Sequence, residues 1–242
     1  MLELRDVSAF YGAVQALHGV TFDVRAGEIL CLLGRNGAGK TTTLKTIMGL
    51  VPGTGTIALD GSALGALPAH EVPRLGIGYV PQGRRLFADL TVDENIQVGL
   101  MTRGKGAATR ARVLDLFPVL GQRLDQRAGT LSGGEQQMLA TARALCLEPR
   151  VILLDEPTEG LQPSMIAIIR QVVTTLRDEG VAVLLVEQRV DAVLAIADRV
   201  TFLENGRSRD TVPARDLRRD PSLIDRYVGV GNSALVARRQ GN

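Results

Sequence analysis

The sequence predicts an α/β fold built on a mostly parallel β-sheet. Two short, continuously apolar segments, 151–154 and 181–186, are typical of strands that are covered on both faces. A segment with helical spacing, 163–178, lies between them, and this alternation of strand and helix favours a parallel sheet. Residues 88–148 contain mainly helical patterns, so we expect an inserted α-helical subdomain there.

The N-terminal residues predict a second, antiparallel sheet. Segments 2–10 and 16–24 have strand character and are separated by a turn at Gly12. Segment 55–59 ends at Asp60-Gly61, which is a favoured hairpin turn. We expect these strands to form an N-terminal antiparallel β subdomain.

Capping and turn signals predict the remaining elements. Thr91 and Ser132 each precede a Glu by three residues, as in a capping box, so a helix is predicted to begin at each. Pro163 suits the first turn of a helix that Gly180 closes. Further predicted elements are strands 28–33 and 77–80, helices 40–50 and 189–197, and a hairpin at 200–211 turned by Asn205-Gly206.

These elements predict a single domain over residues 1–242, long enough to bury a sizeable core. Residues 1–87 and 149–212 are expected to form the core with its β subdomain, and 88–148 the helical subdomain. Residues 213–242 are expected to be a C-terminal tail with a short helix and a loosely held end.

The composition is that of an ordinary globular protein, with 45% hydrophobic and 22% charged residues. A net charge of +2, only 3% aromatic residues and no Trp argue against a nucleic-acid partner. Cys31 and Cys146 form no Cys-x-x-Cys pair and are expected to be buried thiols. His18 and His70 are too few for a metal site and are expected to be structural or on the surface. With no signal pattern and no apolar run of about eighteen residues, we expect a cytoplasmic protein.

Residues 34–41 read Gly-Arg-Asn-Gly-Ala-Gly-Lys-Thr and lie between a predicted strand and a predicted helix. Gly37 and Gly39 let successive backbone N–H groups point at phosphate oxygens, and the helix adds its positive N-terminal end. In this pattern Lys40 reaches the β- and γ-phosphates and the Thr41 hydroxyl binds Mg²⁺. The loop predicts a nucleoside-triphosphate site formed by Gly34, Arg35, Asn36, Gly37, Ala38, Gly39, Lys40, Thr41 and Thr42.

Two acidic residues, Asp155 and Glu156, follow the buried strand 151–154. This position delivers both carboxylates to the carboxyl edge of the sheet, where nucleotides bind. Asp155 is predicted to hold Mg²⁺, mainly through the water that this ion retains. Glu156 is predicted to orient and deprotonate the attacking water. The alternative, two acids that merely close an exposed strand, is disfavoured by the phosphate loop.

Four motifs in one order resemble the nucleotide-binding domain of the ATP-binding-cassette (ABC) family. They are the phosphate loop 34–41, Gln82, Leu-Ser-Gly-Gly-Glu-Gln-Gln at 131–137 and Val-Ile-Leu-Leu-Asp-Glu at 151–156. The resemblance covers the chain to about residue 210 and implies a P-loop NTPase (RecA-like) core that binds ATP. It implies that Tyr11 stacks on the adenine. It also implies that Gln82 senses Mg²⁺ and the water and couples both to the helical subdomain.

The signature at 131–137 predicts a second anion site. If Ser132 caps a helix, its hydroxyl, the amides of Gly133 and Gly134 and the helix terminus form that site, with Glu135 completing the capping box. One chain cannot easily turn this site and its phosphate loop onto the same phosphates. Two chains arranged head to tail can do so, enclosing two ATP molecules. A simple helix cap is the alternative, and it leaves Leu131 and Gln136-Gln137 unexplained.

Two positions depart from the family pattern. Gln188 stands where the family usually has a histidine, and Gln162 where it usually has an aspartate. A glutamine can hydrogen-bond a phosphate or a water but carries no positive charge. Both departures leave ATP binding intact, put efficient turnover at this chain's own site in question, and fit a heterodimer with a more typical second ATPase.

Within the family, several segments resemble the second ATPase of branched-chain amino-acid importers, among them Val-Pro-Gln-Gly-Arg-Arg-Leu-Phe at 80–87 and Val-Glu-Gln at 186–188. Gly-Arg-Asn at 34–36 and Thr-Glu-Gly-Leu-Gln-Pro at 158–163 also resemble urea and short-amide importers, which remain the alternative. Such systems imply a second ABC ATPase, two membrane permeases and, indirectly, a soluble solute-binding protein. They imply a location on the inner face of the cytoplasmic membrane. A groove beside the loop 82–87 is expected to receive a permease helix, and Arg84 and Arg85 are candidates to pair with its acids or simply to be solvated.

Rival functions are less consistent with the sequence. A chromosome-maintenance ATPase needs a long coiled coil between the motifs, for which residues 83–130 are too few. A ribosome-associated cassette protein normally has two cassettes in tandem. A soluble ATP-binding switch with weak or no hydrolysis stays open because of Gln162 and Gln188, although Glu156 argues against it.

Overall fold

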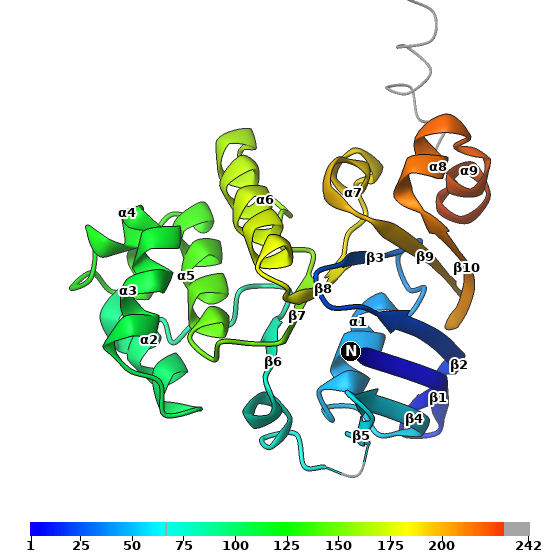
Figure 1. Ribbon diagram of the computed structural model, residues 1–242, viewed down its shortest axis with the longest axis horizontal. Helices are drawn as coiled ribbons and strands as arrows, with labels where there is room; N and C mark the ends of the chain where they lie inside the picture. The colour runs from blue at the N-terminus through cyan, green and yellow to red at the C-terminus, as the bar shows by residue number, and fades with distance from the viewer. Residues whose placement is uncertain (66, 230–242) are drawn as a thin grey trace, which may run out of the picture.

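The computed structural model describes residues 1–65 and 67–229, and its larger sheet confirms the predicted parallel core (Figure 1). Six strands lie in the order β10-β9-β3-β8-β7-β6, and the five from β9 to β6 pair in parallel. Strand β10 adds to one edge in antiparallel pairing across the predicted Asn205-Gly206 turn. The strands are β3 (Ile29–Leu33), β6 (Ile77–Val80), β7 (Val151–Asp155), β8 (Ala182–Val186), β9 (Arg199–Glu204) and β10 (Arg207–Pro213).

The smaller sheet confirms the predicted N-terminal antiparallel subdomain. Its strands lie in the order β2-β1-β4-β5 and all pair antiparallel. Strand β2 begins two residues earlier than predicted, because the ladder continues to the Tyr11–Val14 pair beside the turn. The strands are β1 (Leu2–Tyr11), β2 (Val14–Val24), β4 (Gly53–Leu59) and β5 (Ser62–Ala63).

Alternating side chains of the buried parallel strands divide the interior into two cores. Leu30, Leu32 and Leu184 face the smaller sheet and helix α1 (Lys40–Ile47). Cys31 and Leu185 face the opposite core, which also contains residues of α5, α6 and α7. Since side chains alternate along a strand, a strand covered on both faces is apolar throughout. This is the physical basis of the continuous apolar segments in the sequence.

The helical subdomain projects from the sheets as a separate lobe (Figure 1). Both predicted capping boxes form, at Thr91 with Glu94 and at Ser132 with Glu135. Each box satisfies two backbone N–H groups that a bare helix start leaves unpaired. The lobe contains α2 (Val92–Met101), α3 (Ala107–Leu116), α4 (Pro118–Gly121), the 3₁₀ turn η2 (Ala128–Thr130) and α5 (Gly133–Leu145), and a further 3₁₀ turn, η1 (Val72–Leu75), precedes β6.

The predicted helices form as α6 (Pro163–Asp178) and α7 (Val190–Ile196), and both pack on one face of the parallel sheet. The region beyond β10 is more ordered than the single short helix we expected. Helices α8 (Ala214–Arg219) and α9 (Ser222–Val228) bury Leu217 and Ile224. Tyr227 packs on Phe202 with ring centroids 5.0 Å apart. The rest of the predicted tail, 230–242, lies outside the described residues.

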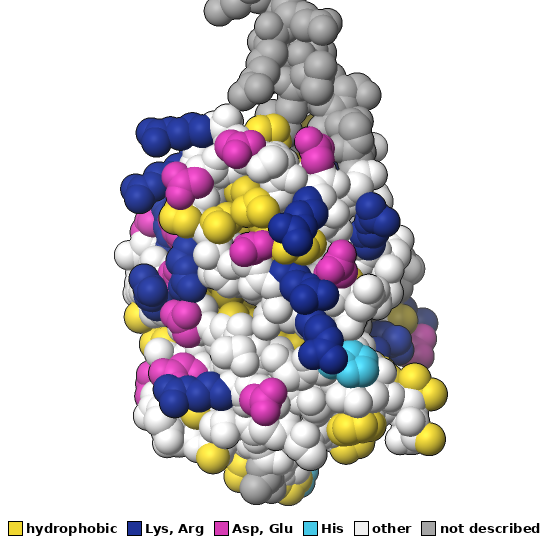
Figure 2. All heavy atoms as spheres, turned by 90° about the vertical axis from the view of Figure 1, so that its right-hand side faces the viewer, with side chains coloured by type: hydrophobic (Ala, Val, Ile, Leu, Met, Phe, Trp, Pro, Cys, Tyr) yellow, Lys and Arg dark blue, Asp and Glu magenta, His cyan; other side chains and the backbone are white. Residues whose placement is uncertain are grey.

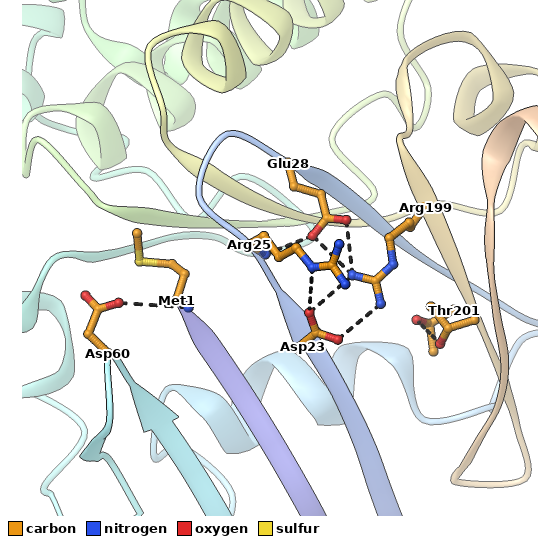
Figure 3. A network of polar contacts seen from close by, with 8 residues as sticks. Met1, Asp23, Arg25, Glu28, Asp60, Arg199 and Thr201 are labelled. Carbon is orange, nitrogen blue, oxygen red and sulfur yellow. Dashed lines mark hydrogen bonds and ion pairs between the residues drawn. The ribbon is translucent and has the colours of Figure 1, made fainter.

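On the side of the molecule that carries α8, α9 and β10, basic and acidic side chains are interspersed (Figure 2). A charge network joins the C-terminal end of β2 to the N-terminal ends of β3 and β9, and so connects the two sheets (Figure 3). Arg199 of β9 donates hydrogen bonds to Asp23 of β2 at 3.1 Å and to Glu28 at 3.1 Å. Because Glu28 is buried, the network supplies the charge partner that a buried carboxylate requires.

An Asp23→Asn variant should be less stable than the wild type by about 0.5–1 kcal/mol at pH 7, since the Asp23 side chain is 44% exposed and therefore screened. The Arg199 guanidinium holds the pKa of Asp23 below its ordinary value of 3.8. A lowered pKa stabilises the folded state above about pH 4, and this contribution disappears as the pH falls through the folded-state value. Urea unfolding at pH 7 and at pH 3 measures the difference. Asp89→Asn is the control, since Asp89 is exposed and forms no ion pair with any residue that the structure describes, and an equal loss there contradicts the prediction.

Candidate functional site

The phosphate loop lies at the carboxyl end of β3 and leads directly into α1. The strand ends of β7 and β8 lie beside it, because the three strands are parallel neighbours. They enclose a cavity of about 590 Å³. Its lining includes Asn36, Gly37, Gly39, Lys40, Thr41, Thr42, Gln82, Glu156 and Gln188 among the predicted residues, together with Gln15, Ala16, His18, Glu159, Asn205 and Gly206.

Glycines allow the phosphate loop to pack closely against neighbouring strands and to adopt a backbone conformation that other residues rarely adopt. A Cβ on Gly34 would lie 2.2 Å from the backbone oxygen of Leu203 in β9. Gly39 has φ +104°, and a Cβ there would lie 2.8 Å from Leu17 of β2. Larger side chains would therefore push the loop away from both sheets.

Lys40 is buried beneath the loop that it follows. Its Nζ donates hydrogen bonds to the backbone oxygens of Gly34 at 2.8 Å and Arg35 at 3.1 Å. Burial lowers the pKa of the Lys40 ammonium group, whereas the charges of Glu156 and Asp155 oppose that change. The amine is thus held at the loop by groups that a phosphate oxygen could replace.

Two of the three side chains predicted at the Mg²⁺ site, Thr41 and Asp155, lie in contact. Thr41 Oγ1 donates to Asp155 Oδ1 at 3.0 Å. Asp155 is only 1% exposed, and within residues 1–65 and 67–229 its Oδ2 has no hydrogen-bond partner. Burial raises the pKa of Asp155, and the hydrogen bond from Thr41 opposes this rise. A buried, unpartnered carboxylate oxygen beside a hydroxyl is a suitable donor set for a hard cation.

Three predicted catalytic residues converge from three different segments. Gln82 follows β6, Glu156 follows β7 and Gln188 lies shortly after β8. Gln82 Nε2 donates to Glu156 Oε2 at 3.2 Å, and Gln188 Nε2 donates to the other carboxylate oxygen. Gln82 also donates to Glu159 at 2.9 Å. Each oxygen of the Glu156 carboxylate therefore faces an amide donor.

Tyr11 and the signature residues are not among the residues that line this cavity. Tyr11 ends β1 of the smaller sheet, and 48% of its surface is exposed. Ser132, Gly133, Gly134 and Glu135 begin α5 and line no part of the cavity. Hydrogen bonding to Ser132 is the main cause of the lowered pKa of Glu135. The contact of the signature residues with ATP bound by a second chain stays a prediction.

The turn at Asn205-Gly206 forms part of the cavity wall. The sequence predicted this turn only as the connection between two strands of a hairpin. Gly206 N donates to Ala38 O at 2.9 Å, and His18 N donates to Gly206 O at 2.7 Å. A Cβ on Gly206 would lie 2.3 Å from Ala16 O. His18, expected to be structural or on the surface, therefore lines the cavity. No local signal in the sequence pairs these segments, which lie far apart along the chain.

A second cavity, of about 620 Å³, lies between α1, β6 and the helical subdomain. Gln82, Thr41 and Asp155 form its inner wall, so it adjoins the first cavity. Phe87 is half exposed in its lining. The Arg143 guanidinium lies 5.1 Å from the Phe87 ring centroid and donates to Arg85 O at 2.6 Å. Arg84, a candidate to pair with a partner's acid or to be solvated, donates to Gln136 at 3.0 Å, and its role toward a partner stays a prediction.

Comparison with known proteins identifies the family. Residues 17–159 match the family described as ABC transporter. The chain belongs to the ABC transporter family. It is 47% identical over 234 residues to the high-affinity branched-chain amino acid transport ATP-binding protein BraG of Pseudomonas aeruginosa, covering 95% of this chain and 100% of that protein.

Two further similarities agree with that family. The chain is 41% identical to the probable branched-chain amino acid transport ATP-binding protein LivF of Archaeoglobus fulgidus, over 86% of this chain and 89% of that protein. A solved ATP-binding subunit of an ABC transporter superposes with a TM-score of 0.83 at 31% identity, covering 98% of both chains. The predicted fold class is thereby confirmed, and this ABC cassette is an ATP-binding ATPase of the kind that is coupled to transport. Within residues 1–65 and 67–229, no helix is both long and apolar enough to span a membrane.

Proposed function

We propose that this ABC cassette hydrolyses ATP to energise the import of branched-chain amino acids. The observation that carries the proposal is the 47% identity to BraG over that protein's whole length. The urea or short-amide alternative is not favoured, because BraG and LivF are both named for branched-chain amino acid transport. The solute itself would be chosen by other subunits, since the cavities described here belong to the nucleotide site and to the groove beside it.

In the proposed reaction, backbone N–H groups of residues 36–42 bind the phosphates of ATP and Lys40 transfers its hydrogen bonds from the loop carbonyls to them. Thr41, Asp155 and the amide oxygen of Gln82 would hold Mg²⁺. That ion supplies charge neutralisation on the β- and γ-phosphates. Tyr11 would stack on the adenine from the exposed end of β1.

Glu156 is the proposed general base. Its carboxylate would accept a proton from water as the water oxygen bonds to the γ-phosphorus and the bond from that phosphorus to the β–γ bridging oxygen breaks. ADP and phosphate are the products. The amides of Gln82 and Gln188 support this role, since they donate to the two carboxylate oxygens and so orient the group without adding charge.

Hydrolysis is proposed to occur between two cassettes. The N-terminus of α5, with Ser132, Gly133 and Gly134, does not line this chain's own cavity, which supports this arrangement. In a head-to-tail dimer it would cap ATP held by the partner's phosphate loop. ATP would then favour the closed dimer and hydrolysis would release it. Gln188 and Gln162 fit a heterodimer in which the second ATPase carries more of the turnover.

The second cavity is the proposed docking groove for a permease. Its exposed apolar side chains, Phe87 and Leu50, suit the apolar face of a short helix from a membrane subunit. Gln82 lines both cavities and donates a hydrogen bond to Glu156. A permease helix that moves Gln82 would therefore change the orientation of the Glu156 carboxylate. The proposed assembly contains a second ABC ATPase and two permeases on the inner face of the cytoplasmic membrane, with a solute-binding protein contributing indirectly and no nucleic acid.

Purification of the tagged chain from detergent-solubilised native membranes in the presence of ATP tests this assembly. We expect two permeases and a second cassette to co-elute, and deletion of this chain to abolish leucine uptake but not urea uptake. A Phe87→Glu variant should lose the permeases while it still binds ATP, because it places a charge in the apolar groove. Ile168→Glu, at an exposed apolar residue on α6 outside the groove, is the control. Recovery of the wild-type chain alone would support the soluble-switch alternative.

A further inference from the structure

The buried carboxylate of Glu187 is linked by a hydrogen bond to the segment that carries the proposed base Glu156. Glu187 follows β8 and is only 3% exposed. Its Oε1 accepts a hydrogen bond from Thr158 Oγ1 at 2.6 Å, and Thr158 is buried as well. Within the described part of the chain, no Lys or Arg forms an ion pair with it. Because burying a carboxylate without a cation is costly, the hydrogen bond from Thr158 is the main compensation.

This hydrogen bond joins the two segments that carry the active groups. Thr158 is the second residue after Glu156, and Gln188 is the residue after Glu187. Gln188 in turn donates to the Glu156 carboxylate. The backbone N–H of Glu156 donates to Val186 O at 2.9 Å. The segments after β7 and β8 are therefore joined by hydrogen bonds at Glu156 itself and two residues beyond it, at Thr158.

The backbone of Glu156 requires such support. Its φ of +49° lies in the left-handed region, which is sterically unfavourable for a non-glycine residue. A conformation of this kind persists only where neighbouring contacts determine it. The tie to Val186 fixes the residue from one side, and the Thr158–Glu187 bond fixes the chain just beyond it.

The surroundings of the bond leave little room for adjustment. Thr158 and Glu187 border a cavity of only about 10 Å³, whose wall also includes Arg170 of α6. Valine has nearly the shape of threonine, so Thr158→Val removes the hydroxyl without opening a cavity. It also leaves the buried Glu187 carboxylate without this donor and so lowers stability, which is why thermal unfolding is measured beside the rate.

We infer that Glu187 is a positioning residue, which through Thr158 holds Glu156 and Gln188 in the geometry for attack on the γ-phosphate. It touches neither ATP nor the attacking water. The inference rests on the proposed role of Glu156. It assigns a function to an acidic residue at the point where this chain departs from the family pattern.

The test measures ATP hydrolysis by the full chain with Mg²⁺, together with ATP affinity and thermal unfolding. Thr158→Val should lower kcat about tenfold and leave KM for ATP within about twofold, because misplacement of a reacting group slows only the chemical step. Glu187→Ala should have the same effect, and the double variant should be no slower than the slower single one. Thr158→Ser, which keeps the hydroxyl, should recover most of the rate.

Two reference variants keep the outcome decisive. Thr201→Val removes another buried threonine hydroxyl, which is bonded to Thr211 at 2.8 Å and does not line the cavity, and should leave kcat unchanged. Glu156→Gln reports whether the measured rate belongs to this site. If Glu156→Gln is inactive while folded Thr158→Val retains full kcat, the positioning role alone is refuted. A parallel loss of ATP affinity and stability in Thr158→Val and Thr158→Ser would also refute it. If Glu156→Gln hydrolyses ATP normally, the proposed base is refuted, and this inference with it.

Discussion

A Glu156→Gln variant is expected to hydrolyse ATP at least about 100-fold more slowly than the wild type and to bind it as tightly. The substitution preserves the shape of the side chain but removes the group that would accept the proton of water. Because ATP would persist between the two cassettes, the variant should accumulate as an ATP-dependent dimer. Phosphate release and light scattering with and without ATP measure both effects.

The matched control for that variant is Glu179→Gln, which neutralises an acid that lies outside the cavity and pairs with Arg112. It should hydrolyse ATP at the wild-type rate. Unchanged phosphate release by Glu156→Gln would assign the base elsewhere and strengthen the soluble-switch alternative. A loss of rate without dimer formation would instead argue against the head-to-tail arrangement.

A Lys40→Met variant is expected to weaken ATP binding by at least about 100-fold, since it removes the charge-assisted hydrogen bonds to the β- and γ-phosphates. Thermal stability should change little. Methionine has a similar volume, and the lost bonds to Gly34 O and Arg35 O are offset by the removal of a buried charge. Isothermal titration with ATP and thermal unfolding measure the two quantities separately.

Lys105→Met is the control for charge removal, because Lys105 pairs with Glu148 in the helical subdomain. It should bind ATP normally. If Lys40→Met retained its affinity, Lys40 would be a structural residue that closes the loop over its own carbonyls. If it unfolded at room temperature, Lys40→Arg would provide the measurement of affinity in a folded chain.

The sequence predicted most of the fold because its signals are local. Apolar strands at 151–154 and 181–186, the capping boxes at Thr91 and Ser132 and the hairpin at 205–206 each depend on neighbouring residues, and the structure contains all of them. The predicted ends of the elements were less accurate. Strand β2, for example, begins earlier than predicted because its pairing with β1 continues up to the turn. The C-terminal helices α8 and α9 were underestimated, since the burial of Leu217 and Ile224 depends on a surface formed elsewhere in the chain.

By itself, the sequence determined which residues to propose for the nucleotide site, because the phosphate loop and the acids after β7 form compact motifs whose chemistry is set by spacing. Only the tertiary structure decided which distant residues join them. It placed His18 and Gly206 in the cavity wall, brought Gln82 and Gln188 to the two oxygens of Glu156, and buried Glu187 against Thr158. Contacts of this kind arise where parallel strands end side by side, and that adjacency follows from the order of strands in the sheet, which no local pattern encodes.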